Sequence, residues 1–312
     1  MRVEYHRTLL ADRVRNGAFR TALERCVIPG TTTVADIGAG TGFLGFLAAK
    51  LGAKRVDLYE AAEIAGLARK LIGCNRLANC RIAAVHSTEA VEPERVDVVV
   101  CETLGNYPFE ENIIATLNDA RRRYLKAGGA MIPQGVRQFV CPVTAQRLYR
   151  ELAMWDEVGF GLDFTPAKVM SLNNIYVRSL RAGDLLEGGA VAKVWDEVSF
   201  LRHNKTTRTG EANWRFADAA LICGLALWWS AELAPGVVLS TSPAAPPTHW
   251  EQLYLPVLAP IAVRRSQTLS CRLRSTTSFA RGTNVSWSLT LSDASGRALV
   301  RQALDLERGY LP

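Results

Sequence analysis

The 312-residue sequence lacks the features that mark secreted, membrane-spanning and zinc-binding proteins. Its seven cysteines include no Cys-x-x-Cys pair, which argues against a zinc site and against a disulfide framework. The N-terminus has no apolar segment of the signal-peptide kind, and the longest apolar run, residues 219–231, is too short to span a membrane. We therefore expect a cytoplasmic protein with no bound metal and no membrane partner.

The sequence also lacks a concentrated block of charge, although its formal net charge is +7. Such an excess can indicate a nucleic-acid partner. Here the cations are spread along the chain, and the one tight cluster, residues 121–123, lies where a helix is expected to end and where cations complement the helix dipole. Nucleic acid is therefore not the expected partner.

The most informative stretch that is present, residues 34–44, is an apolar strand that leads into a glycine turn and a helix. Glycines at alternate positions leave backbone N–H groups uncovered at a helix N-terminus, where a nucleotide-like ligand can bind. Glu60 ends the next apolar strand, 18 residues after Gly42, close to where a doubly wound fold places the acceptor for ribose hydroxyls. A tight turn without a ligand is the alternative. The candidate residues of the turn are Asp36, Gly38, Gly40, Thr41 and Gly42.

The order of the elements predicts two domains. Apolar strands at 34–37, 56–60, 81–85 and 96–101 alternate with helices, which is typical of a doubly wound α/β sheet, and one amphipathic helix at 8–26 precedes them. After residue 133 the pattern changes to short strands and turns, which indicates an antiparallel barrel or sandwich. We expect domains at 1–133 and 134–312, with a less regular segment at about 151–188.

A pair of carboxylates follows the strand at 96–101. Glu102 leaves the end of this buried strand and needs a partner, whereas Glu110 and Glu111 are expected in the first turn of the next helix, where the dipole favours anions. Glu102 and Glu111 can converge on one point, and a guanidinium is the planar cation that matches paired carboxylates. The pattern therefore favours a substrate that carries a guanidinium group.

Three motifs resemble those of the protein arginine methyltransferases, a family of class I S-adenosylmethionine-dependent enzymes. The double-glutamate hairpin corresponds to residues 101–106 with Glu111, and the Thr-His-Trp loop corresponds to residues 248–250. The N-terminal motif of the family matches His6, Leu9, Leu10, Asp12 and Arg15. The resemblance covers nearly the whole chain, and the chain is most similar to a divergent, bacterial-type member of this family.

The resemblance implies S-adenosyl-L-methionine as cofactor, S-adenosyl-L-homocysteine as product, and a role for each matching residue. Arg15 would hold the cofactor carboxylate, Glu60 the ribose, and Glu89 the adenine amine, while Glu102 and Glu111 would clamp the target guanidinium. His249 would pair with Asp12 and brace the wall of the active site. The remaining residues implied are His6, Asp36, Gly38, Gly40, Thr41 and Gly42 for the cofactor, and Trp250, Leu9 and Ile113 for the substrate.

The resemblance also implies a Rossmann-like domain, a β-barrel domain and a helical dimerisation arm at about 151–188, hence a homodimer. Asn106 stands where the family hairpin usually has tyrosine, and the tyrosine-rich helix before His6 is missing from this sequence. Leu9 and Ile113 stand where the family has methionines that border the methyl-accepting pocket, so mono-, asymmetric and symmetric dimethylation all stay open.

The net positive charge works against arginine-rich substrates, so a small guanidino metabolite or modified peptide stays open in place of a protein. A nucleic-acid-binding protein or methyltransferase is the remote alternative, and such a methyltransferase would be expected to carry an Asn/Asp-Pro-Pro-aromatic element after the fourth strand, where residues 101–104 stand instead.

Overall fold

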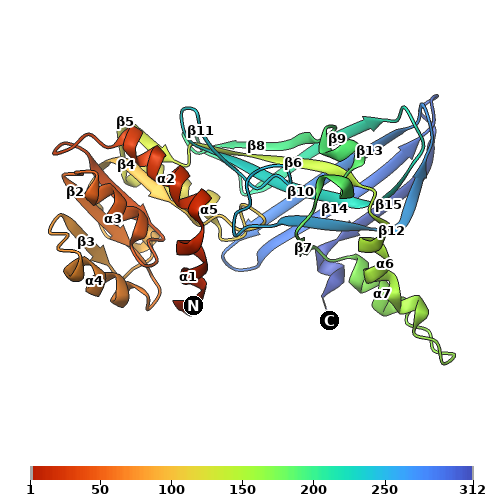
Figure 1. Cartoon of the computed structure of the whole chain (residues 1–312), viewed down its shortest axis with the longest axis horizontal. Coiled ribbons are helices and arrows are strands. Elements are labelled where there is room, and N and C mark those ends of the chain that lie inside the picture. Colours follow the sequence, from red (N-terminus) through yellow and green to blue (C-terminus); the bar gives the residue numbers. More distant parts are fainter. Residues whose placement is uncertain (1–2, 311–312) are drawn as a thin grey trace.

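The computed structural model describes residues 3–310 and has two parts that lie side by side (Figure 1). A parallel sheet with its helices forms one part, and two antiparallel sheets form the other. One hydrophobic core cluster contains residues of both parts, among them Phe109, Trp229 and Trp250. The two parts are therefore packed against each other through apolar side chains.

The parallel sheet has five strands in the order β3-β2-β1-β4-β5. All of its strand pairs are parallel, which confirms the predicted doubly wound fold. Residues of β1 are buried throughout, as expected for a central strand that is covered on both faces. The elements are β1 (Thr33–Ile37), α3 (Phe43–Lys50), β2 (Arg55–Tyr59), α4 (Ala65–Cys74), β3 (Cys80–Ala83), η1 (Ser87–Glu89), β4 (Val96–Cys101), α5 (Ile113–Arg123) and β5 (Leu125–Ile132).

The N-terminal helical segment differs from the single helix expected at 8–26. It consists of α1 (Val3–Ala11) and α2 (Arg13–Cys26), which are separated at Asp12. Asp12 has extended backbone angles and accepts a hydrogen bond from the Arg15 N–H, so it caps α2 instead of continuing α1. The apolar spacing did not reveal this break because Leu9, Leu10, Val14 and Ala18 keep a helical spacing across residue 12.

The antiparallel part contains a six-stranded and a four-stranded sheet. Their main orders are β7-β12-β10-β6-β8, with β11 paired to β10, and β15-β14-β13-β9. Strand pairing gives two separate sheets, so the expected closed barrel is not found among the described residues. Alternating burial shows which face of a strand is covered, but it carries no information about which strand edges pair. The strands are β6 (Gly135–Val143), β7 (Tyr176–Arg178), β8 (Lys193–Ser199), β9 (Thr207–Arg215), β10 (Ala220–Ala234), β11 (Val237–Ser240), β12 (Gln252–Val263), β13 (Thr268–Ser278), β14 (Gly282–Ser292) and β15 (Ala298–Asp305).

Two short helices, α6 (Gln146–Ala153) and α7 (Thr165–Leu172), pack against the six-stranded sheet through Leu148, Leu152 and Leu172, and the loop between them projects from the molecule (Figure 1). Phe160 in this loop has 95% of its surface exposed, and Leu162 has 63%. The short 3-10 helices of this part are η2 (Met154–Glu157), η3 (Ala182–Asp184), η4 (Leu186–Gly189) and η5 (Leu306–Gly309). Within residues 3–310 no helix is both long and apolar enough to cross a membrane.

Candidate functional site

A cavity of about 260 Å³ lies at the carboxyl ends of the parallel strands. This is the place where open α/β sheets bind their ligands. Because β3 and β4 lie on opposite sides of β1, the cavity has a β4 end, marked by Glu102 and Glu111, and a β3 end, marked by Val85, His86 and Ser87. The other sequence-predicted residues on its wall are His6, Leu9, Arg15, Asp36, Gly38, Gly40, Thr41 and Glu60.

The glycine turn forms the floor between the two ends. Gly40 has a φ of +56°, and a Cβ there would approach Cε1 of His6 to 3.0 Å, so a side chain would be strained and would crowd helix α1. Gly42 has a φ of +87° and begins α3, but it is not part of the cavity wall. A Cβ at Gly42 would collide with the ring of Phe46 at 2.5 Å, so this glycine is required by packing under the turn.

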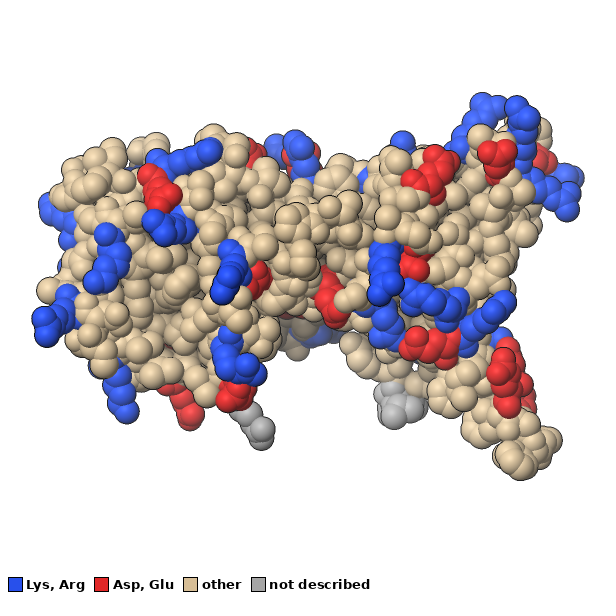
Figure 2. Space-filling view, in the orientation of Figure 1, with Lys and Arg blue, Asp and Glu red and all other residues tan. Residues whose placement is uncertain are grey.

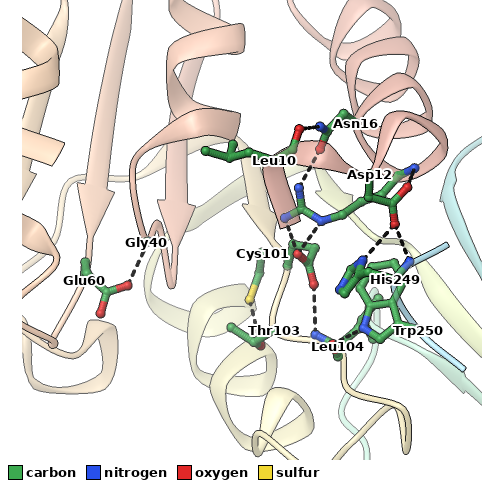
Figure 3. Close-up of polar contacts among 12 residues, drawn as sticks. Leu10, Asp12, Asn16, Gly40, Glu60, Cys101, Thr103, Leu104, His249 and Trp250 are labelled. Atoms are coloured by element: carbon green, nitrogen blue, oxygen red, sulfur yellow. Dashed lines mark hydrogen bonds and ion pairs between the residues drawn. The ribbon is translucent and has the colours of Figure 1, made fainter. Parts of the chain in front are cut away.

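Two carboxylates hold the turn in place. Glu60 accepts hydrogen bonds from the Gly40 N–H at 2.8 Å and from the Ala62 N–H at 2.7 Å, and Figure 3 shows the first of these. Asp36 is buried and accepts the Gly45 N–H at 2.7 Å. Burial raises the pKa of Asp36 to about 7, against the opposing effect of the Gly45 hydrogen bond. The turn is thus fixed by carboxylate-to-backbone contacts from both β1 and β2.

At the β4 end, Glu102 is paired with a cation from within the chain. The Arg15 Nε donates to Oε2 of Glu102 at 2.7 Å, and Nη2 of Arg15 donates to the same oxygen. Both side chains are almost fully buried, with 6% and 5% of their surface exposed. Burial raises the pKa of Glu102, and the Arg15 guanidinium acts against this rise. The partner that a buried Glu102 requires is therefore supplied by α2, a contact that the sequence pattern did not reveal.

Glu111, unlike Glu102, has no cationic partner among the described residues. It lies on the cavity wall and makes no side-chain hydrogen bond or ion pair among the described residues. Burial raises the pKa of Glu111, and the nearby charge of Glu60 raises it further. The expectation that Glu110 and Glu111 lie in the first turn of a helix was wrong, because α5 begins only at Ile113, after Asn112 in the left-handed region. Glu110 instead accepts the Asn106 N–H and closes the loop on itself.

Asp12 joins the N-terminal helices to the antiparallel part. Its Oδ2 accepts hydrogen bonds from the backbone N–H and from Nδ1 of His249, both at 2.8 Å, as Figure 3 shows. Burial acts to raise the pKa of Asp12, but the hydrogen bonds that it accepts from Arg15 and His249 hold the pKa below its ordinary value. Burial lowers the pKa of His249, against the opposing effect of Asp12. Asp12 thus caps α2, which carries Arg15, and also anchors the loop of His249.

The loop at 102–111 is held from behind by hydrogen bonds with the antiparallel part, three of which involve Leu104, Gly105 and Asn106. The Trp250 Nε1 donates to the carbonyl of Leu104 at 2.8 Å, and the Trp229 Nε1 donates to the carbonyl of Gly105 at 3.0 Å. The side-chain oxygen of Asn106 accepts the Glu251 N–H at 2.8 Å. Asn106 stands where the resembled family usually has tyrosine, and it connects the loop at 102–111 to the loop of Trp250 and Glu251.

Several predicted residues lie near the cavity but not on its wall. Trp250 and Ile113 are buried behind it, His249 and Asp12 brace it, and Glu89 is exposed on η1 beyond the β3 end. The wall also includes residues that sequence reasoning did not select. The available signal was their position, since most follow a parallel strand or lie on the N-terminal helix: Tyr5, Tyr59, Val85, His86, Ser87, Thr103 and Thr116.

The wall fits an adenosyl amino acid such as S-adenosylmethionine. Oγ of Ser87 and Nε2 of His6 are both buried and have no hydrogen-bond partner among residues 3–310, so each can bond a polar ligand. Glu60 retains lone pairs for ribose hydroxyls, and Arg15 is the one cation on the described wall that can face a ligand carboxylate. Among residues 3–310 there is no cluster of three or more His, Cys, Asp or Glu placed to hold a metal ion.

Comparisons with protein families identify both parts of the chain. Residues 137–294 match the arginine methyltransferase oligomerization subdomain, and residues 20–141 match the ribosomal protein L11 methyltransferase family. Protein arginine N-methyltransferase 6 of Xenopus laevis is 31% identical over 268 residues, which cover 81% of this chain and 78% of the relative. The probable protein arginine N-methyltransferase 3 of Arabidopsis thaliana is also 31% identical, over 85% of this chain, but this chain spans only 48% of its length.

Solved structures show the same fold. One is the Trypanosoma brucei protein arginine methyltransferase 1 enzyme-prozyme heterotetrameric complex with AdoHcy. Its TM-score is 0.83 at 22% identity, and the match covers 97% of this chain and 98% of the solved chain. Protein arginine methyltransferase 10 of Arabidopsis thaliana has a TM-score of 0.81 at 21% identity, with 98% of each chain covered. Since one family model matches half of the chain and a 31% identical relative is covered over most of its length, this chain belongs to the protein arginine N-methyltransferase family.

Proposed function

We propose that the protein transfers a methyl group from S-adenosylmethionine to the guanidinium of an arginine in a protein or peptide. The observation that carries this proposal is the placement of Glu102 and Glu111 on the wall of one cavity that also contains the glycine turn and Glu60. A cofactor site next to two carboxylates suits a cationic, planar acceptor. The family of the chain supports the same chemistry.

Each carboxylate has its own part in binding the acceptor. Arg15 occupies Oε2 of Glu102, whereas Oε1 accepts only a 3.3 Å contact from the Leu104 N–H and retains a lone pair for a substrate guanidinium. Glu111 has no competing hydrogen bond and can turn toward the same group. Ionised carboxylates on two nitrogens draw positive charge toward those atoms and leave the third nitrogen more nucleophilic. The cofactor supplies an activated methyl group, so the protein mainly has to align the acceptor and exclude water.

The remaining roles belong to the same proposal. Arg15 would hold the cofactor carboxylate while it keeps Glu102 in place, and Glu60 and Glu89 would bind the ribose and the adenine. His6, Asp36 and the glycine turn would shape the cofactor bed, and Leu9 would border the acceptor. His249 would act through Asp12, and Trp250 through the loop that it holds, as positioning residues.

The proposal is tested by methyl transfer from labelled S-adenosylmethionine to arginine peptides, arginine-containing proteins, free arginine and RNA. We expect label on peptidyl or protein arginine only. Label on free arginine alone would replace the substrate with a small guanidino compound, and label on RNA would replace it with nucleic acid. On the face shown in Figure 2, cationic side chains are scattered over the parallel-sheet part and gathered in clusters over the antiparallel part, with carboxylates beside them, and they do not form one stripe along the molecule.

A homodimer, a cytoplasmic location and a domain division at residue 133 are part of this proposal. The dimer is supported by the match to an oligomerization subdomain and by the exposed apolar side chains of Phe160 and Leu162 in the projecting loop between α6 and α7. Sedimentation of a Phe160→Asp, Leu162→Asp double variant should show a monomer where the parent chain shows a dimer. The matched control, Leu299→Asp on β15, should leave the parent state unchanged, and a monomeric parent chain would refute the dimer.

A further inference from the structure

A wall residue at the β3 end of the cavity, His86, is contacted by a residue of the antiparallel part. The hairpin between β13 and β14 pairs Ser278 with Gly282 and carries Phe279 at its turn. The ring of Phe279 lies edge-on to the ring of His86, with 5.6 Å between the ring centroids and an angle of 89° between the planes. His86 is part of the cavity wall, so this contact places the antiparallel part directly behind the β3 end.

Phe279 makes this contact although most of its side chain is exposed. Its side chain has 62% of its surface exposed, so it contributes little to the hydrophobic core. An edge-to-face aromatic pair gives a defined geometry and stabilises its partners beyond simple burial of area. Nδ1 of His86 lies 2.7 Å from Oγ1 of Thr88 and accepts the Thr88 N–H at 3.4 Å, so one edge of the ring is held from within its own loop. The contact with Phe279 adds a second constraint on the ring, from the antiparallel part.

The same hairpin also contacts the loop of the β4 end. The Tyr107 hydroxyl donates a hydrogen bond to Oγ of Ser275 on β13, and Tyr107 belongs to the loop that runs from Glu102 to Glu111. One hairpin therefore touches the supports of both ends of the cavity. A shift of this hairpin would change the β3 wall and the carboxylate loop together.

We propose that Phe279 is a positioning residue for the cofactor, which braces His86 so that the β3 end closes over the adenine-bearing half of the ligand. The adenine is assigned to this end because Glu102 and Glu111, which hold the methyl acceptor, occupy the opposite end. This inference rests on the proposed cofactor but not on the identity of the methyl acceptor. Cofactor affinity thus depends on a side chain from the domain that supplies no group to the reaction.

Calorimetric titration of the full chain with S-adenosylhomocysteine tests the proposal without any methyl acceptor. Loss of one aromatic pair should weaken binding by about threefold to tenfold in Phe279→Ala, and Phe279→Tyr should restore it, since the ring edge is retained. Arg281→Ala is the matched control on the same turn, because the only contact found for Arg281 is through its backbone N–H. His86→Ala should weaken binding as much as Phe279→Ala, and the double variant should be no weaker than either single variant.

Kinetics separate positioning of the cofactor from general damage to the fold. Phe279→Ala should raise the KM for S-adenosylmethionine by the same factor, with kcat and the KM for the peptide unchanged. Equal affinity of Phe279→Ala and the parent chain for S-adenosylhomocysteine, or additive losses in the double variant, would overturn the inference. Failure of the parent chain to bind S-adenosylhomocysteine would instead contradict the cofactor itself, so the two failures are distinguishable.

Discussion

The two ends of the cavity are built by different physical means. At the β4 end, Glu102 is held by the Arg15 guanidinium, and α2, which carries Arg15, is anchored through Asp12 to His249. At the β3 end, the contact across the two parts of the molecule is the ring pair of His86 and Phe279. The link between the two parts is therefore made by ions and hydrogen bonds at one end and by the packing of rings at the other.

The difference follows from what each end has to hold. A buried carboxylate is costly unless it is paired and hydrogen-bonded, so the β4 end requires a connected set of partners. In our proposal the β3 end holds the adenine, a flat base whose binding requires shape and exclusion of water, which aromatic packing supplies. Damage at the β4 end should therefore affect both catalysis and folding, whereas damage at the β3 end should affect cofactor affinity alone.

The largest effect is expected for Glu102→Gln. Loss of the negative charge leaves the buried Arg15 guanidinium unpaired, which should lower the free energy of unfolding by about 3 kcal/mol. It also removes a preorganised charge from the acceptor, so kcat should fall by about 100-fold to 1,000-fold. Denaturant titration and single-turnover transfer measure the two effects, and a variant with parental stability would show that the pair with Arg15 is unimportant for folding.

Glu111→Gln separates the two roles that Glu102 combines. Because Glu111 has no hydrogen bond in the described chain, the free energy of unfolding should change by less than about 0.5 kcal/mol. The rate of transfer should still fall by about 100-fold, since the second carboxylate of the clamp is lost. Retention of the parental rate would remove Glu111 from the acceptor site.

The pH dependence of transfer should reflect the ionisation of Glu111. Burial and the charge of Glu60 raise its pKa above the ordinary value, and only its ionised form can bind a guanidinium. The rate should therefore increase with pH through a pKa above that of an ordinary glutamate and fall about tenfold for each pH unit below it. In Glu111→Gln the loss of rate at acidic pH that is due to this group should disappear. If the pH–rate profile of the variant were unchanged, another group would be responsible for the loss.

His249→Ala should have a smaller effect, because Asp12 keeps the hydrogen bonds from the two backbone N–H groups. We expect a loss of about 1–2 kcal/mol of stability and a decrease in kcat of about tenfold, since Arg15 is held less firmly. His249→Asn, whose amide can donate to Asp12, serves as the conservative control. If both variants had parental kcat, bracing through Asp12 would be irrelevant to catalysis.

Ser87→Ala should have the smallest effect and tests the β3 end. The Ser87 hydroxyl is buried and has no hydrogen-bond partner in the described part of the chain, so its removal should not lower the stability of the free protein. If the hydroxyl bonds the cofactor, affinity for S-adenosylhomocysteine should fall by about threefold to tenfold. Thermal unfolding with and without S-adenosylhomocysteine measures both quantities, and a lower melting temperature of the free variant would mean that the hydroxyl stabilises the fold.

Much of the site could be predicted because it depends on local patterns. The glycine turn, Glu60 at the end of β2 and Glu102 at the end of β4 follow from strand-to-turn patterns that parallel sheets bring to one edge. The break between α1 and α2 was missed because the Asp12 cap is stabilised by a contact 237 positions away, with His249, as well as by the local Arg15 N–H. The start of α5 was predicted too early for a related reason. Glu110 accepts a hydrogen bond from the Asn106 backbone, so residues 106–110 form a closed loop and α5 begins only at Ile113.

The sequence by itself determined the parallel sheet, the position of the cavity at its carboxyl edge and the acidic character of the β4 end. Periodicity and turn chemistry act over a few residues, so they can be read directly from the chain. Only the tertiary structure decided that Arg15 is the partner of Glu102, that the second part forms two separate sheets, and that Phe279 lies against His86. These contacts join residues that are distant in sequence, and their geometry is set by how the two parts pack, which no local pattern encodes.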